Sequence, residues 1–569
     1  METIVNGLQG LVSYAVPMAV LLGLLIFVHE MGHFLVAKYY KVRVEVFSLG
    51  FGPKLFKFKR GDTVYAISAI PLGGYVKMFG DDPTAEVSAD QKQYSFIHKP
   101  VGQRIGVVLA GPLMNFFFAI LLFAAVALLG EQALAPKVGD VETQSAAYQA
   151  GFRSGDTVVS MASVPVKTWD EFQHQVEANA DKTVAVVVQR SAGQQETLQV
   201  TPKLETNKNV LSWDRHVGEV DGLSYASRAS VIGIPDPQSI AAQAGLKTGD
   251  VIQTLNGEKI TKWRDFEEAL TKNAGADKLE FEVERGLLDE KKDIGALPAA
   301  PGPKFTISMP VDAKGKSFDQ IIKSIGLEFP ELFLAGVEKG APASAAGLLK
   351  GDRLLTIDGQ DVHTFEQVAS IIRSFGGAAK TALTVTASRE GKVLSFSLSP
   401  NMKERMSPQG REEKRFEIGI RPLIVDASPA TLQLTATNPV EAVSRGISQT
   451  LKWTSLTVLS FVRLIQNEVS PKNIGGFLSI GQMAKKSWQI GPGQFLNIMA
   501  IISINLFILN LLPVPVLDGG HLVFYSIEAL RGAPLSMRKM EIAQQVGLVL
   551  LLGLMVFAMF NDVSRFFFN

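Results

Sequence analysis

Four runs of about 20 apolar residues constrain this 569-residue chain more than any other feature of its sequence. They extend over residues 17–37, 105–130, 495–512 and 546–560. Runs of this length are typical of helices that cross the hydrocarbon core of a bilayer, which is about 30 Å thick. A long polar, Gly-rich middle separates the first two runs from the last two. The sequence therefore predicts a polytopic α-helical membrane protein with about four transmembrane helices and folded domains between its second and third spans.

The charges of the connecting segments predict the orientation of these spans. Residues 38–104, between the first two runs, contain eleven Lys/Arg and six Asp/Glu, and Arg531, Arg538 and Lys539 lie between the last two. Because Lys and Arg are enriched in cytoplasmic loops, both connections are expected in the cytosol, with the polar middle and both chain ends outside. A further run at 447–465 contains two basic residues and several Ser/Thr, which favours an interfacial helix over a fifth span.

Charge balance and cysteine content exclude several classes of protein and site. The formal net charge is +1, so no global basic field indicates a nucleic-acid partner. The chain has no cysteine, which excludes disulfides and thiolate metal sites, and any metal must be held by His, Asp or Glu. No Lys or Arg precedes the first apolar run and no small-residue cleavage site follows it, so a cleaved signal peptide is not expected.

The first apolar run contains the motif His29-Glu30-Met31-Gly32-His33. Histidines at i and i+4 share one helix face, so both imidazoles can reach one zinc ion, with Glu30 placed to take a proton from a water. With only seven histidines in the chain, chance produces such a motif in roughly one sequence in a few hundred. Each ionisable group at membrane depth costs roughly 2.5–3.5 kcal/mol, so this cluster needs a compensating partner. The alternative is a polar helix end that projects into the cytosol.

A third metal ligand is expected in the segment Leu517-Asp518-Gly519-Gly520-His521. In the predicted topology the first and third spans both run from outside to cytosol, so Asp518 can lie at the depth of the two histidines. A catalytic zinc takes three protein ligands and keeps one position open, and His29, His33 and Asp518 would supply the three. His521 is the rival ligand. The alternative role for Asp518 is an ordinary helix-ending residue before a Gly-Gly turn.

Two asparagines lie in these apolar surroundings. Asn115 follows Gly-Pro in the second run, at roughly the depth of the histidines, and helix–helix hydrogen bonding is the common use of such an amide. Asn510 precedes Pro513 and Pro515, which break helix hydrogen bonds. Because broken helices at membrane depth are tolerated where they line a cavity, Asn510 could hold a substrate backbone or a developing oxyanion.

Residues 42–78 alternate apolar and polar side chains and include Pro71-Leu72-Gly73-Gly74-Tyr75. Alternation of this kind, ending in a Gly-Gly turn signal, predicts β-hairpins. We expect this β-hairpin region at the membrane face. An ordinary cytosolic hairpin is the alternative.

The polar middle, about residues 133–402, contains one pattern three times. Each copy has a Gly-x-x-x-Gly-Asp segment, an aromatic residue eighteen positions after the first Gly, and an Arg about forty positions on. The segments begin at Gly151, Gly245 and Gly347, the aromatic residues are Trp169, Trp263 and Phe365, and the arginines are Arg190, Arg285 and Arg389. We expect three tandem α+β domains at 133–204, 225–312 and 326–402, with a loose insertion at 286–303. The pattern resembles the PDZ domain, which binds extended peptide ends by strand addition. Alternatively, the repeats are spacers.

The motifs in combination resemble those of the site-2 protease family. They are the HExxH of the first run, PLGGYVKM at 71–78, AGPLMN at 110–115, the PDZ-like repeats and NLLPVPVLDGGH at 510–521. The chain is most similar to the bacterial sigma-E regulator protease branch. The resemblance covers the N-terminal membrane region 1–132, the C-terminal membrane region 403–569 and the repeats between them.

This resemblance implies an intramembrane zinc metalloprotease in the bacterial inner membrane, with periplasmic repeats. Its substrate would be a single-pass transmembrane protein, typically an anti-sigma factor that another protease has already trimmed outside. The implied residues are His29, His33 and Asp518 as Zn²⁺ ligands, Glu30 as catalytic base, and Asn510 and Asn115 as substrate-binding residues. The Gly73-Gly74 hairpin would meet the substrate as an added strand. The branch usually carries two PDZ domains, and three are expected here, so the resemblance does not assign substrate gating to a particular copy.

The residues alone leave two other functions open. A membrane scaffold would bind peptide termini through its PDZ-like repeats and carry a non-catalytic metal site. A metal transporter would spread polar residues through several spans, whereas the fourth run has almost none. Turnover of a membrane peptide that a chelator inhibits and zinc restores distinguishes the protease from the scaffold.

Overall fold

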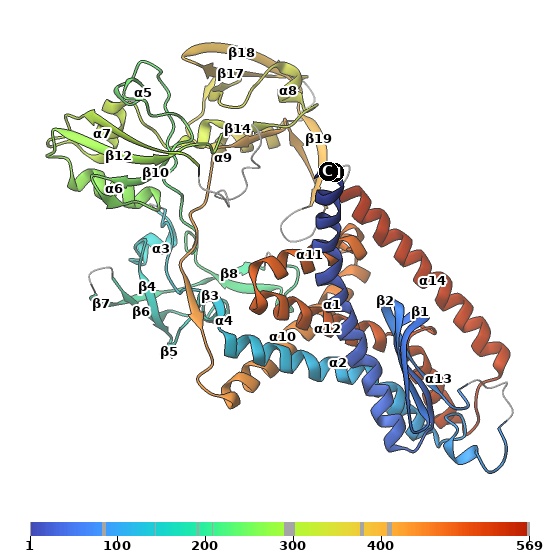
Figure 1. Cartoon of the computed structure of the whole chain (residues 1–569). Helices are drawn as coiled ribbons and strands as arrows, with labels where there is room; N and C mark the ends of the chain where they lie inside the picture. Colours follow the sequence, from blue (N-terminus) through green and yellow to red (C-terminus); the bar gives the residue numbers. More distant parts are fainter. Residues whose placement is uncertain are drawn as a thin grey trace.

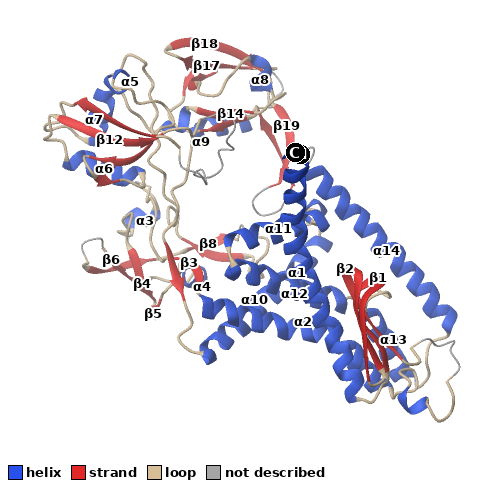
Figure 2. Cartoon of the chain, in the orientation of Figure 1, coloured by secondary structure: helices blue, strands red, loops and turns tan. Residues whose placement is uncertain are grey.

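The structure is a computed structural model that describes residues 2–81, 87–142, 144–190, 193–207, 209–288, 302–375, 381–406 and 412–565. A helical bundle forms one end of the molecule and three small α+β units form the other (Figures 1 and 2). Most of the insertion expected at 286–303 lies outside the described residues.

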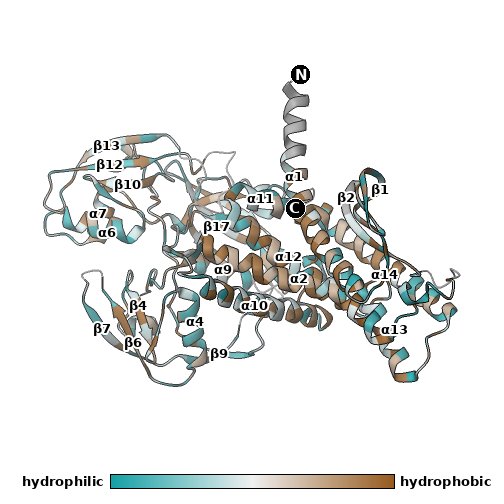
Figure 3. Ribbon diagram, turned by 60° about the horizontal axis from the view of Figure 1, so that its bottom comes forward, coloured by the Kyte–Doolittle hydropathy of each residue, from teal (hydrophilic) through white to brown (hydrophobic). Residues whose placement is uncertain are grey.

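Four helices are long and apolar enough to cross a membrane. They are α1 (Glu2–Tyr39), α2 (Val101–Leu129), α12 (Pro492–Leu511) and α14 (Met537–Val563). Each coincides with one of the four apolar runs to within one residue at the helix end, and Figure 3 shows hydrophobic residues concentrated on helices such as α2 and α12. Helix α2 is central, because α1, α10 (Pro439–Ile465), α12 and α13 (Asp518–Arg531) all pack against it. The core between α1, α2 and α12 includes Leu21, Leu25, Ala119, Phe123, Met499 and Ile504.

Strands β1 (Val44–Arg60) and β2 (Thr63–Met78) form a bulged antiparallel sheet beside α1. Residues 44–49 pair with 74–78 on one side and with 64–67 on the other, while the rest of β1 folds back onto the start of β2. The bent ribbon therefore has segment 74–78 at one edge. Aromatic residues join the sheet to the helix, since Phe47 contacts both Phe27 and Phe34 of α1.

The middle of the chain contains three four-stranded sheets with one strand order. These orders are β5-β4-β6-β7, β11-β10-β12-β13 and β16-β15-β17-β18. The strands are β4 (Thr157–Met161), β5 (Val164–Pro165), β6 (Val184–Gln189), β7 (Gln195–Val200), β10 (Val251–Leu255), β11 (Glu258–Lys259), β12 (Lys278–Glu284), β13 (Lys304–Pro310), β15 (Arg353–Ile357), β16 (Gln360–Asp361), β17 (Leu383–Arg389) and β18 (Lys392–Leu398). We call the three units the first, second and third repeat domains.

Each repeat domain has a short helix before its sheet and a longer helix that begins at the repeated aromatic residue. The short helices are α3 (Ala146–Gln149), α5 (Ile240–Gln243) and α8 (Pro342–Ala346). The longer helices are α4 (Trp169–Ala178), α6 (Trp263–Lys272) and α9 (Phe365–Arg373). Thr168 and Thr364 cap α4 and α9 by accepting a backbone N–H through their side chains, which explains where these two helices begin.

The repeated Gly, Asp and Arg form the same buried contact in all three domains. Arg285 donates to both carboxylate oxygens of Asp250 at 2.7 Å and to the carbonyl oxygen of Gly245 at 2.8 Å. The equivalent contacts join Arg389 to Asp352 and Gly347, and Arg190 to Asp156 and Gly151. The hydrogen bonds that Asp250 accepts from Arg285 raise the pKa of Arg285 above its usual range. The fixed spacing of these landmarks thus reflects a structural need: the buried Asp carboxylate of each domain requires the Arg as its charged partner.

The chain that follows each sheet differs between the three domains. A hairpin of β8 (Lys203–Thr206) and β9 (His216–Glu219) follows the first sheet. Helix α7 (Phe318–Ile325) follows the second and packs on α6, where the Phe318 ring contacts the rings of Trp263 and Phe266.

The third sheet is followed by β19 (Asn401–Met406), β20 (Glu412–Glu417) and β21 (Ile420–Pro422). Strand β21 pairs with β14 (Leu334–Val337), which precedes the sheet of the same domain. The third repeat domain therefore continues beyond residue 402, the limit expected from the sequence. Sequence periodicity does not predict this extension, because β21 is short and the whole sheet separates it from β14 in the sequence.

Two elements join the repeat domains to the bundle. Strand β3 (Glu131–Leu134) pairs with β22 (Thr431–Leu434), where the chain leaves the bundle and returns to it. Helix α10, which contains the expected interfacial segment 447–465, makes polar contacts with the first repeat domain and its flanking loop. Lys452 donates to Asp170 at 2.7 Å, and Trp213 Nε1 donates to Ser455 at 2.9 Å. Helix α11 (Phe477–Ile490) then leads into α12.

Candidate metal centre

Three of the predicted ligands meet inside the bundle. His29 and His33 lie on α1, and Asp518 is the first residue of α13. His29 Nε2 lies 3.2 Å from His33 Nε2 and 3.2 Å from Asp518 Oδ2, and His33 Nε2 lies 3.6 Å from the same oxygen. Within the described part of the chain, this is the only group of three or more such side chains that could hold a metal ion.

The donor atoms fit a zinc ion. Two ligands at about 2.1 Å from a tetrahedral zinc are about 3.4 Å apart, which matches the measured separations. Asp518 Oδ2 is buried and forms no hydrogen bond with any described residue, although both imidazole nitrogens face it. A buried carboxylate oxygen without a donor is costly, and a cation between the three atoms compensates for it. Nitrogen and oxygen donors are also the only metal-binding types that a chain without cysteine offers.

Close contact between α1 and α2 positions His33. A Cβ at Gly111 would lie 2.2 Å from His33 Nε2, and a Cβ at Gly32 would lie 2.2 Å from the Ala110 carbonyl oxygen. Both glycines therefore make room at this helix crossing. His33 Nδ1 lies 2.9 Å from the Val107 carbonyl oxygen, so Nδ1 carries the proton and the lone pair of Nε2 faces Asp518.

A break between α12 and α13 places Asp518. The chain leaves the helical path around Pro513 and Pro515, and Gly519 and Gly520 then pack against the backbone of this turn. A Cβ at Gly520 would lie 2.4 Å from the Val514 carbonyl oxygen, which explains the second glycine. Asp518 thus stands at a helix N-terminus, where the helix dipole favours a carboxylate.

An ion pair ties α13 to α2. Arg104 donates to both carboxylate oxygens of Glu528 at 3.1 and 2.5 Å, and both side chains are largely buried. The Arg104 guanidinium also lies 4.8 Å from the ring centre of Tyr525. Sequence reasoning missed this pair, because its partners are 424 positions apart.

The edge of the β1–β2 sheet adjoins Glu30. The backbone of Val76 in β2 lies near the Glu30 carboxylate. A Cβ at Gly74 would lie 3.1 Å from Glu30 Cγ, so the backbone passes against this side chain. At Gly73, where φ is +154°, the Phe51 ring occupies the space of a Cβ. The structure therefore places Gly74 against the predicted base, whereas Gly73 packs against Phe51.

Both predicted asparagines face His29. The amide nitrogens of Asn115 and Asn510 each lie 3.5 Å from His29 Nδ1. Asn115 is fully buried, and its Oδ1 has no hydrogen-bond partner among the described residues. Asn510, near the end of α12, is partly exposed.

His521 lies outside the group of three donors. It lines a cavity of about 340 Å³ between α13 and α14, together with Pro515, Glu541 and Gln545. Its ring packs near Phe524 and Tyr525. The rival ligand of the sequence analysis is therefore placed beside the centre, and Asp518 faces the histidines.

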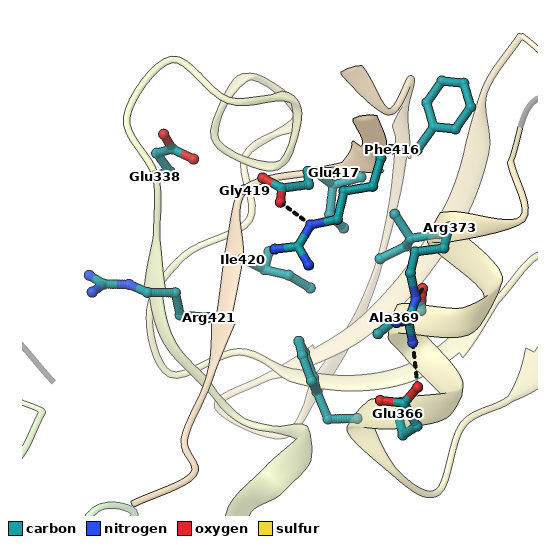
Figure 4. Close-up of a pocket in the computed structure, with 13 residues that line it drawn as sticks. Glu338, Glu366, Ala369, Arg373, Phe416, Glu417, Gly419, Ile420 and Arg421 are labelled. Carbon is teal, nitrogen blue, oxygen red and sulfur yellow. Dashed lines mark hydrogen bonds and ion pairs between the residues drawn. The ribbon is translucent and has the colours of Figure 1, made fainter. Parts of the chain in front are cut away.

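A second candidate site is a groove in the third repeat domain, shown in Figure 4. Its volume is about 690 Å³, and it lies between α9 and the segment 415–421. Phe365, Ala369 and Ile372 form its apolar wall, while Arg373 pairs with Glu366 and Arg415 with Glu417 at its border. In the second repeat domain α7 covers the corresponding helix α6.

Comparisons with known proteins agree with the metal centre. Peptidase family M50 matches residues 17–554. A Neisseria meningitidis protein whose name describes a zinc metalloprotease is 32% identical over 95% of this chain and 97% of its own length. The regulator of sigma-E protease RseP of Salmonella typhimurium is 30% identical over 96% of this chain and 97% of its own. A solved PDZ domain protein from Parabacteroides distasonis is 11% identical over 51% of this chain and 95% of its own, with a TM-score of 0.14.

The extent of these matches confirms the family that the sequence motifs predicted, and the family match includes both halves of the metal centre. The chain belongs to peptidase family M50 and is a zinc metalloprotease of the site-2 type.

Proposed function

We propose that His29, His33 and Asp518 hold the catalytic zinc of this intramembrane protease and that Glu30 is its base. The observation that carries the proposal is the convergence of three donor atoms, 3.2 to 3.6 Å apart, between apolar helices. The enzyme would hydrolyse a peptide bond in or near the transmembrane segment of its substrate.

When bound, zinc supplies a Lewis acid that polarises a carbonyl group and lowers the pKa of a water molecule. Glu30 accepts the proton of the attacking water and passes it to the leaving amine as the peptide C–N bond breaks. The backbone of β2 at Gly74 lies against the Glu30 side chain and limits where its carboxylate can move. Asn510, partly exposed beside His29, is placed to donate to a substrate carbonyl.

Edge pairing would present the substrate in extended form. A helical substrate keeps its carbonyl groups in hydrogen bonds, so it must unwind before cleavage. Segment 74–78 lies at an edge of its sheet and adjoins Glu30, so an added strand there would run past the base. Gly74 lets the backbone of this edge pass directly against Glu30, and Gly73 lets the Phe51 ring pack on the same segment. Both glycines are proposed to contribute to substrate binding in this way.

The location and partners follow from the charge bias and from the relatives. The apolar helices and the sigma-E relatives indicate an inner-membrane protein. We place the repeat domains outside and the metal centre in the cytosolic half of the bilayer, because the basic connections belong in the cytosol. The substrate is proposed to be a single-pass, anti-sigma-factor-like protein that another protease has already trimmed.

The repeat domains are proposed to be three PDZ-like units with unequal roles. The groove of the third domain is open and could take an extended peptide beside β21. In the second domain α7 packs where such a peptide would contact α6. Peptide binding is therefore assigned to the third domain and not to the second.

A Glu30→Gln variant tests the catalytic assignment. We expect it to retain zinc and to leave a co-expressed single-pass substrate uncut, because Gln cannot accept the proton. Exposed Glu541 on α14 offers a matched control, and Glu541→Gln should cleave at the wild-type rate. Immunoblotting of the substrate and metal analysis of the purified chain provide the readouts.

Cleavage by the Glu30→Gln variant would contradict the assignment of the base. The scaffold alternative predicts no turnover by the wild-type chain under any condition. Inhibition by a chelator and recovery with added zinc would exclude that alternative.

A further inference from the structure

We propose that Asn115 is a positioning residue for His29: its amide oxygen accepts the Nδ1–H of His29 and fixes Nε2 towards the metal. This inference rests on the proposed ligand set and deepens it. It assigns to the second membrane helix a part in the metal centre besides packing.

The proton of His29 must lie on Nδ1. His29 Nε2 faces Asp518 Oδ2 and His33 Nε2, each at 3.2 Å, so its lone pair is the one directed into the centre. A neutral imidazole carries one proton, and a ring that binds metal through Nε2 carries it on Nδ1. Such an N–H normally has an acceptor, which fixes the tautomer and the ring orientation.

The groups that approach His29 Nδ1 are the amides of Asn115 and Asn510, each at 3.5 Å. With Nδ2 towards the ring, two donors face one nitrogen and the buried Asn115 Oδ1 has no partner. The oxygen and nitrogen of an amide exchange places when the group turns by 180°, and the hydrogen-bond partners decide between the two orientations. Turning the Asn115 amide gives the Nδ1–H an acceptor and gives the buried oxygen a donor.

Asn115 suits this role better than Asn510 does. The Asn115 side chain is fully buried, and its backbone carbonyl accepts a hydrogen bond from Ser503 Oγ of α12 at 2.8 Å. This bond fixes residue 115 between α1 and α12. Asn510 is partly exposed, so water or substrate can satisfy its amide oxygen.

The second histidine shows the same arrangement. His33 Nδ1 lies 2.9 Å from the Val107 carbonyl oxygen, which is also on α2. Helix α2 therefore supplies an acceptor to both histidines of the motif, one from its backbone and one from a side chain. An acceptor for each Nδ1–H fixes the tautomer and the ring orientation of both histidines, so that each Nε2 faces the metal.

Zinc affinity tests the inference directly, without reference to activity. The full-length chain is purified in detergent, and its zinc dissociation constant is measured by competition with a chelator. Asn115→Leu keeps the size of the side chain but removes the acceptor, and we expect a roughly ten- to hundredfold loss of affinity. Asn115→Asp keeps the acceptor and should bind zinc at least as tightly as the wild type.

Asn505 on α12 supplies a matched control, since its amide oxygen accepts from Thr457 Oγ1 at 3.0 Å, away from His29. Asn505→Leu should retain wild-type zinc affinity. Asn510→Leu should also retain it while its KM for substrate rises, which separates the two amides.

The outcomes are distinct. Wild-type zinc affinity in Asn115→Leu would overturn the positioning role. If that variant does not fold, the zinc affinity of Asn115→Asp tests the proposal instead. Wild-type or tighter binding would support an acceptor at residue 115, whereas a tenfold loss would show that the residue acts as a donor and would overturn the proposal. Loss of zinc in His29→Ala, with none in Asn115→Leu, would leave the ligand set intact and reject only this inference. Wild-type affinity in His29→Ala would reject the ligand set itself.

Discussion

At the scale of single residues, the candidate metal centre depends on glycines, which leave space for its ligands, as well as on the ligands themselves. His33 can face Asp518 because Gly111 leaves its ring room, and Glu30 lies against β2 because residue 74 has no Cβ. Spacing alone identifies the histidines and the base. The glycines around them become meaningful only when the facing helix and strand are known.

Gly111→Ala should displace His33. Its new Cβ would lie 2.2 Å from His33 Nε2, far inside van der Waals contact, so the ring must leave its place. We expect zinc affinity to fall at least tenfold, and proteolysis with it. Chelator competition on the purified chain measures the first effect.

Gly102 on the same helix provides the control for Gly111. A Cβ at Gly102 meets nothing within 4 Å, so Gly102→Ala should bind zinc like the wild type. Unchanged zinc affinity in Gly111→Ala would show that the helix crossing relaxes without moving His33.

At the scale of elements, the third ligand is set by how α13 is attached. Asp518 begins this helix, and Glu528 near its other end pairs with Arg104 of α2. Helix α1 is attached to the same α2 through the contacts at Gly32 and Gly111. Helix α2 is therefore the common support on which the two halves of the centre are aligned.

Glu528→Gln should loosen α13 and weaken the centre. The Arg104 side chain is 11% exposed, so loss of its partner leaves a buried cation unpaired and destabilises this attachment. We expect a roughly tenfold loss of zinc affinity and a lower melting temperature of the purified chain. Calorimetry and chelator competition give the two values.

The exposed pair of Arg264 and Glu268 on α6 is the control for this change. Exposed ion pairs contribute about 0–1 kcal/mol, so Glu268→Gln should leave both values unchanged. Equal zinc affinity in Glu528→Gln and the wild type would show that Asp518 is held by its own turn alone.

At the scale of the whole molecule, a membrane-embedded centre and a set of folded repeats are joined by two narrow connections. Strands β3 and β22 pair where the chain passes from bundle to repeats and back. Helix α10 contacts the first repeat domain through Lys452. These contacts place the repeats beside one end of the bundle.

The proposed sidedness can be tested by single cysteines, because the natural chain has none. Val393 in the third repeat domain is 68% exposed and Leu530 at the end of α13 is 89% exposed. In spheroplasts, a membrane-impermeant maleimide should label Val393→Cys and leave Leu530→Cys unlabelled until the cells are lysed. Labelling in the reverse order would contradict the proposed topology.

Much of the architecture was predictable from local pattern. The apolar runs predicted the membrane helices because spanning length and hydropathy are properties of a continuous segment. The spacing of His29 and His33 predicted a shared ligand face, and the parity of the spans predicted Asp518 as their partner. The Gly-Asp-Arg landmarks recurred because each copy buries the same ion pair.

Other features depended on contacts between segments far apart in the chain. The covering of α6 by α7, the pairing of β21 with β14 and the attachment of α13 through Arg104 leave no periodic signal in the sequence. The family resemblance implied a substrate-binding role for Asn115, and its burial beside His29 is the basis of our proposal that it supports a ligand. The sequence position of an Asn in an apolar run does not show which residue of another helix forms a hydrogen bond with its amide.

The sequence by itself determined the membrane class and the family and predicted the donors of the candidate metal centre, because these follow from composition and spacing along one helix or one turn. Only the tertiary structure decided which groups lie against those donors, which repeat helix is covered by α7 and which strand edge adjoins the base. The physical reason is that ligand identity is a local chemical property, whereas ligand orientation depends on close packing between helices that the chain order does not place together.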